Sequence, residues 1–94
     1  MKHPHTHSSH PALIKRLRRA GGHLNSVIEM LEQGRECLDI AQQLQAVEKA
    51  ISQAKKVLVQ DHIDHCLEHA LEDARRSGPS AASLDEFKQI TRYL

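Results

Sequence analysis

The sequence has few aromatic residues and no tryptophan, so large rings contribute little to its hydrophobic core. Its 94 residues include one tyrosine, Tyr93, and one phenylalanine, Phe87. A chain of this length forms one domain at most and buries only a modest, aliphatic core by itself. We therefore expect that burial is completed by association with further copies of the chain.

Long hydrophobic runs are also absent. No stretch of about 18 apolar residues occurs, so we expect no membrane-spanning helix, and the N-terminus has no apolar signal-peptide core. The two cysteines, which accompany eight histidines, do not have the composition of a disulfide scaffold. These absences predict a protein of the reducing cytoplasm. An enzyme is not expected either, because no set of nucleophile, base and orienting group is recognisable.

The sequence has no large excess of positive or negative charge, since the formal net charge is only +1. The charges are, however, unevenly distributed along the chain. Acidic side chains gather between Asp61 and Asp73, where we expect a solvated face. A basic block gathers near the N-terminus and consists of Lys15, Arg16, Arg18 and Arg19. Such a block can bind DNA phosphates with a salt-dependent affinity, or it can be solvated surface. No helix-turn-helix or zinc-finger pattern accompanies it.

The periodicity of the chain predicts an all-α fold with three helices. Residues 1–10 are polar and rich in histidine, which we interpret as a flexible tail, with a purification tag as the alternative. Residues 11–94 are expected to form a single helical domain. Its first helix begins near Pro11 and ends at Gly34, because apolar residues recur there at steps of three and four. A linker over 75–83 and a capping box from Ser83 to Glu86 precede a short third helix.

The second helix is predicted to run from about residue 37 to about residue 75, with no glycine or proline until Gly78. This length is unusual for such a small protein. One short chain cannot cover both sides of so long a rod, so helix pairing between subunits is expected.

Two residues of this helix have the spacing of a chelating pair. His62 and Cys66 are four positions apart and therefore lie on one helical face. Imidazole and thiolate together suit Cu(I), Zn(II), Ni(II) or Co(II). Taken alone, however, such a pair often has only a structural role at a helix interface.

The only other thiol, Cys37, is a candidate third ligand. Along a straight helix at about 1.5 Å per residue, Cys37 and His62 would lie roughly 38 Å apart. An antiparallel partner helix removes this difficulty by bringing Cys37 of one subunit beside the other subunit's pair, twice in a two-fold dimer. Its position at a helix N-terminus also favours a thiolate. A fourth ligand could come from the tail, from His3, His5 or His7.

Three segments of the chain resemble the CsoR/RcnR family of metal-responsive repressors: KRLRRAGGHLNSVIEML, ECLDIAQQLQAVEKAI and DHIDHC. The resemblance spans about residues 11–94. It implies a three-helix protomer that forms an antiparallel dimer and then a dimer-of-dimers tetramer. It also implies that the metal-free protein binds operator DNA and releases it when metal binds, so that metal-efflux genes are transcribed.

The resemblance also implies a ligand set. The family's sensor positions fall on Cys37, His62 and Cys66, the trio of its copper sensors. Its nickel and cobalt sensors add an N-terminal histidine, which falls on His5. Copper members often carry tyrosine where this chain has Glu36. The pattern therefore favours Ni(II) or Co(II) as effector, with Cu(I) or Zn(II) as alternatives.

Two other functions remain open at this stage. A repressor of the same fold could sense thiol oxidation or persulfide through Cys37 and Cys66 without needing His62. A metal storage or delivery protein would bind the metal but have no DNA role.

Overall fold

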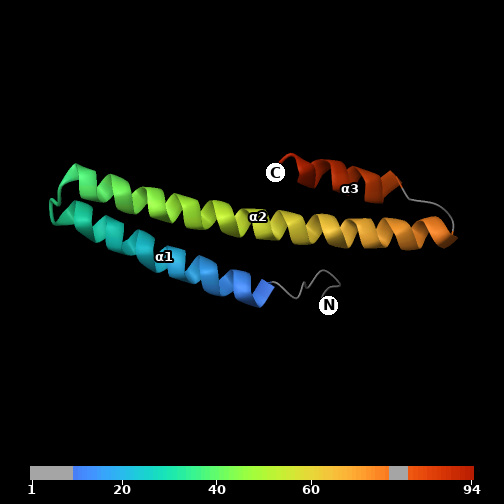
Figure 1. Cartoon of the computed structure of the whole chain (residues 1–94), viewed down its shortest axis with the longest axis horizontal. Coiled ribbons are helices and arrows are strands. Elements are labelled where there is room, and N and C mark those ends of the chain that lie inside the picture. The colour runs from blue at the N-terminus through green and yellow to red at the C-terminus, as the bar shows by residue number, and fades with distance from the viewer. Residues whose placement is uncertain (1–9, 77–80) are drawn as a thin grey trace. The chain divides into compact units, whose positions relative to one another are not determined.

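The computed structural model describes residues 10–76 and 81–94, and this part of the chain is helical with no strand. The helices are α1 (His10–Glu32), α2 (Cys37–Arg76) and α3 (Ala81–Thr91), shown in Figure 1. The predicted all-α class and the long second helix are confirmed. Most of the predicted tail, including His3, His5 and His7, lies outside the described residues. The contacts divide the chain into two compact units, the first ending at Lys55 and the second beginning at Lys56.

The connection between α1 and α2 is a tight helix cap centred on Gly34. This residue has a φ of 71°, a left-handed conformation that glycine adopts without the steric penalty of a Cβ atom. The Arg35 amide donates to the carbonyl of Met30 at 3.0 Å, and the Gly34 amide donates to that of Leu31 at 3.1 Å. This is the hydrogen-bond pattern of a Schellman cap, which satisfies carbonyls at the helix end. Gly34 thus ends α1, as predicted.

The core of the first unit follows a seven-residue repeat on both helices. Leu13, Ala20 and Val27 are buried on α1, while α2 contributes buried residues at equivalent steps. Seven residues are close to two helical turns, so such residues lie along one seam. The centre of the seam is a cluster of Val27, Ile40 and Val47, against which Met30 packs. The residues buried along α2 in this unit are Ile40, Val47 and Ala54.

The second unit contains the rest of α2 together with α3, and Val59 and Cys66 are buried apolar residues among those that the structure describes there. The predicted start of α3 is wrong. The helix begins at Ala81 rather than after Ser83, because two consecutive alanines have the highest intrinsic helix propensity. Ser83 therefore lies within the first turn and does not precede it. At the other end the chain tightens into successive i to i−3 hydrogen bonds, and the α-helix stops at Thr91.

Many apolar side chains remain exposed on the single chain. On α1, Ile14 is 50% exposed and Ile28 is 45% exposed, and on α2 Leu44 and Ile51 are 43% and 45% exposed. Exposed apolar side chains of this kind are available for contacts with another protein chain. Of the helices that the structure describes, none has the length and apolar character needed to cross a membrane.

Candidate metal centre

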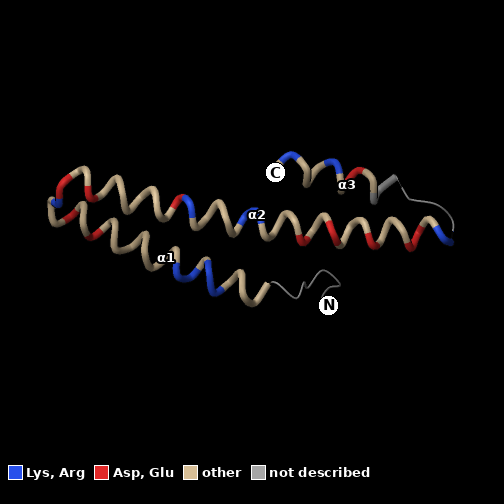
Figure 2. The backbone as a smooth tube through the Cα atoms, in the orientation of Figure 1, with Lys and Arg blue, Asp and Glu red and all other residues tan. Residues whose placement is uncertain are grey.

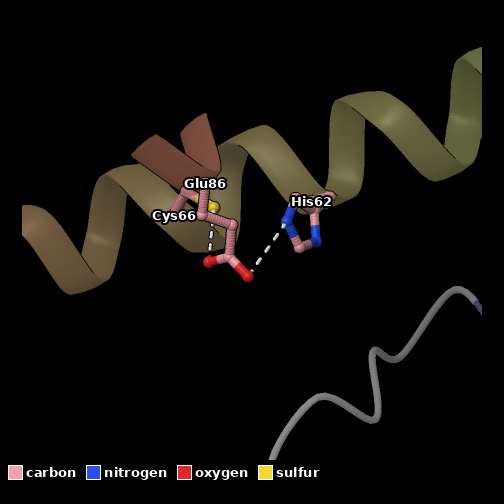
Figure 3. Close-up of side chains that lie close together, drawn as sticks. All are labelled: His62, Cys66 and Glu86. Atoms are coloured by element: carbon pink, nitrogen blue, oxygen red, sulfur yellow. Dashed lines mark hydrogen bonds and ion pairs between the residues drawn. The ribbon is translucent and has the colours of Figure 1, made fainter. Parts of the chain in front are cut away.

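The His62–Cys66 pair lies in the second unit, on the side of α2 that meets α3. Helical geometry places both side chains on one face of α2, as their spacing predicts. The third member of the group is Glu86 of α3, whose carboxylate reaches the pair (Figure 3). One candidate ligand atom from each of these residues lies within 4.8 Å of the other two. We refer to His62, Cys66 and Glu86 as the sensor group.

The carboxylate of Glu86 contacts both other members of the sensor group. Its Oε1 accepts a hydrogen bond from the Cys66 thiol, with an Sγ···O distance of 3.6 Å. Its Oε2 lies 3.9 Å from Nε2 of His62, which makes an ion pair when the imidazole is protonated. Each carboxylate oxygen thus faces a different donor atom of α2 (Figure 3). Glu86 itself is half exposed, at 51% of its side chain, so solvent has access to the group.

The thiol of Cys66 is held in its neutral form. Burial raises the pKa of Cys66, and the negative charge of Glu86 and the hydrogen bond to it raise this pKa further. All three causes act against the thiolate, because the anion loses hydration and meets a second negative charge. A cation placed between these groups would reverse this balance, since a coordinating thiol is deprotonated by its metal.

The donor atoms of the sensor group suit a transition metal. They are an imidazole nitrogen, a thiol sulfur and a carboxylate oxygen. These three atom types bind Zn(II) and other divalent first-row transition metals in proteins. Three such atoms on two packed helices form a partial coordination sphere with open positions. The residues present therefore fit a metal ion.

Of the four predicted ligands, only His62 and Cys66 are brought together. Cys37 is exposed at the first position of α2, and it is not part of the sensor group. His5 lies outside the described residues. The ligand role predicted for these two residues stays a prediction.

Sequence reasoning missed Glu86 as a site residue and placed it in a capping box. Because it lies on another helix, no spacing within α2 could have identified it. Only the packing of α3 on α2 places its carboxylate beside the chelating pair.

A second feature of functional interest is a basic groove in the first unit. Arg16 and Arg19 line it on α1, and the half-buried His23 lies one turn further on. The His23 ring is within 2.5 Å of the Gln43 side-chain oxygen. Figure 2 shows the cluster of basic residues on α1 to which these arginines belong. All four residues of the predicted block are exposed. The lining residues of the groove are Arg16, Arg19, Ala20, His23, Ala50 and Gln53.

Comparison with known proteins gives consistent results. Residues 9–93 match the family model described as metal-sensitive transcriptional repressor. The copper-sensing transcriptional repressor CsoR of Mycobacterium ulcerans is 33% identical over 82 residues, which are 87% of this chain and 67% of that protein. CsoR of Bacillus subtilis is 31% identical over 80 residues, 85% of this chain and 79% of that protein. The chain thus spans about two thirds of the length of its mycobacterial relatives.

A solved structure supports the same assignment. The nickel-responsive transcriptional regulator InrS superposes with a TM-score of 0.74 at 29% identity, covering 98% of this chain and all of that one. The three-helix architecture is therefore shared with a metal-responsive regulator. The family is one of transcriptional repressors, in agreement with the prediction that the chain is not an enzyme. The chain belongs to the family of metal-sensitive transcriptional repressors.

Proposed function

We propose that this protein is a cytoplasmic repressor that binds operator DNA when metal-free and releases it on binding Ni(II) or Co(II), so that metal-efflux genes are transcribed. The observation that carries the proposal is the sensor group, in which His62, Cys66 and Glu86 present nitrogen, sulfur and oxygen donors within 4.8 Å of one another.

The sensor group by itself leaves coordination positions to fill. We propose that Cys37 of a second subunit supplies another thiolate, and that His5 supplies a further nitrogen. Cys37 is exposed at the start of α2, so another chain can approach it. The exposed apolar side chains of α1 and α2 support association into an antiparallel dimer, and a dimer of dimers would cover more of this surface. In that assembly each site joins two subunits.

The DNA-binding surface in this proposal is the basic block of α1. Four basic residues are exposed on α1, where their charges can neutralise backbone phosphates: Lys15, Arg16, Arg18 and Arg19. Binding of this kind releases counterions, so affinity falls steeply as the salt concentration rises. Arg16 and Arg19 also line the groove that continues to His23 and Gln53. A phosphate bound by the two arginines would therefore lie in this groove.

Release follows from linkage between the two ligands. A metal that binds the DNA-free conformation more tightly must weaken DNA binding by the same factor. In the metal-free protein the Cys66 thiol donates to Glu86 of α3 at 3.6 Å. A metal held by His62 and Cys66 would require the thiol to give its proton to water, which would remove this hydrogen bond and free the Glu86 carboxylate to bind the metal or to move away. The contact between α2 and α3 therefore differs between the two states.

The effector is proposed from two lines of support. The fold is shared with the nickel-responsive InrS, and Glu36 precedes Cys37 where copper sensors of the family often have tyrosine. Cu(I) is the second candidate, because the relatives with matching sequences are named copper-sensing repressors. Three ligands with two sulfurs would suit Cu(I), whereas four ligands with two nitrogens would suit Ni(II), Co(II) or Zn(II).

The test is fluorescence anisotropy with a DNA duplex selected by the metal-free protein from a random-sequence pool. Ni(II), Co(II), Cu(I) and Zn(II) are then added separately to the complex. We expect Ni(II) or Co(II) to release the DNA, and Arg16→Ala/Arg19→Ala to weaken DNA binding without loss of metal binding. Selection of no duplex at low salt would overturn the repressor proposal in favour of metal storage. Release by a thiol oxidant but by none of the metals would favour a thiol sensor.

A further inference from the structure

A second cluster of metal-binding side chains lies on α2, outside the sensor group. Its members are His65, Glu68, His69 and Glu72, which together line one open hollow on the surface of the second unit. We call them the outer cluster. It shares no residue with the sensor group.

Helical spacing places the outer cluster on one face of α2. His65 and His69 are four residues apart, as are Glu68 and Glu72, and the histidines and glutamates alternate at steps of three and one. Residues three and four apart are neighbours on a helix surface. This face is turned by about 60° from the His62–Cys66 face, because each histidine lies three residues beyond a sensor residue.

The two imidazoles of the outer cluster are already in contact. The ring centroids of His65 and His69 are 4.4 Å apart, and the rings meet edge to face at 62°. A bidentate chelate on a helix requires this proximity, and the side chains would have to rotate so that one nitrogen of each ring points towards the ion. His65 is half-buried, whereas Glu68, His69 and Glu72 are exposed. The two carboxylates are therefore able to turn towards an ion above the rings.

The charge of this surface favours a cation. The latter part of α2 carries many acidic residues (Figure 2), and Glu68 and Glu72 give the hollow two negative charges beside two imidazoles. The donors are nitrogen and oxygen without sulfur, a set that suits divalent Zn(II), Ni(II), Co(II) or Cu(II) rather than Cu(I).

We propose that His65 and His69, together with Glu68 or Glu72, form a second metal site that takes a divalent first-row transition metal through two imidazoles and a carboxylate. Water fills the remaining positions, because the hollow is open to solvent. Without a thiolate ligand, this site loads at higher metal concentration than the sensor group. The protein then holds more than one divalent ion per chain. Oxidation or alkylation of the cysteines does not affect binding of the second ion.

Equilibrium dialysis of the full chain against Zn(II) tests the proposal. Wild-type protein is compared with His65→Gln/His69→Gln and with a control, His23→Gln, whose histidine lies on α1. We expect the double variant to bind one Zn(II) fewer per chain, or to bind it more weakly by more than the roughly tenfold to hundredfold that outer-sphere partners of a metal contribute. The control should bind as much as wild type. Equal stoichiometry and affinity in wild type and double variant would overturn the proposal.

A second measurement needs no variant. Zn(II) should protect the exposed His69 of the wild-type protein from acylation by diethyl pyrocarbonate, read by peptide mass spectrometry. Unchanged acylation of His69 at saturating Zn(II) would overturn the proposal, even if the double variant fails to fold. Alkylation of Cys66 in the same samples reports the sensor group separately. Failure of the outer cluster is therefore distinguishable from failure of the sensor site.

Discussion

Replacing Cys66 by serine should change how metal affinity depends on pH. The raised pKa of Cys66, caused first by burial and then by Glu86, keeps its thiol protonated at neutral pH. A metal that binds this sulfur must displace the proton, so binding releases one proton per Cys66. Each released proton raises the apparent affinity about tenfold per pH unit, equivalent to about 1.36 kcal/mol. Between about pH 7 and pH 8, Cys66 thus contributes about tenfold.

The assay is a competition titration of Ni(II) and of Zn(II) against a chromophoric chelator at several pH values in this range. Wild type should gain about tenfold more affinity than Cys66→Ser over one pH unit, because serine has no proton to release there. Ser52→Ala is the control and should keep the wild-type slope, since Ser52 is exposed on α2 and belongs to no proposed ligand set. If the Cys66→Ser protein gained affinity with pH as steeply as wild type, Cys66 would not be a ligand and the reasoning would be refuted.

Three further predictions concern the carboxylate, the thiol and the core. Glu86→Gln should weaken metal binding by at least roughly tenfold, measured by calorimetry, whereas the neighbouring Asp85→Asn should not; equal effects would count against Glu86. The folded state holds the Cys66 proton more tightly than the unfolded state, so the stability of the fold should decrease as pH rises above the usual thiol pKa. In thermal unfolding, Cys66→Ala should lack this decrease. The same pH dependence of stability in Cys66→Ala and wild type would contradict the prediction. Val27→Ala should lower the free energy of unfolding in urea by about 1–3 kcal/mol, because the side chain is 1% exposed, whereas exposed Asn25→Ala should change it by less than about 0.5 kcal/mol.

Most of the fold could be predicted from the sequence, because it depends on local signals. Apolar periodicity predicted α1 and α2, and Gly34 marked the turn between them, since the left-handed conformation there favours glycine. The start of α3 was missed by a few residues. The capping-box pattern at Ser83 competed with the helix propensity of Ala81 and Ala82, and propensity decided the boundary.

The candidate site was predictable only in part. The spacing of His62 and Cys66 is a local signal, and it correctly placed the two on one face of α2. Glu86 is about twenty residues further along the chain and reaches them only through the packing of α3, which the sequence pattern does not encode locally. The basic groove was likewise predictable only in part. Arg16 and Arg19 belong to a basic block that is visible in the sequence, whereas Gln53 of α2 joins them only through tertiary packing.

The most direct test of the central claim is the coupling between metal and DNA measured as a closed cycle. Metal affinity is determined for the free protein and for its complex with the selected duplex, and DNA affinity is determined with and without metal. We expect metal to bind the free protein more tightly by the same factor by which it weakens DNA binding, and we expect His62→Ala to abolish this factor. Equal metal affinity in the free and DNA-bound protein, or full coupling in His62→Ala, would contradict the account.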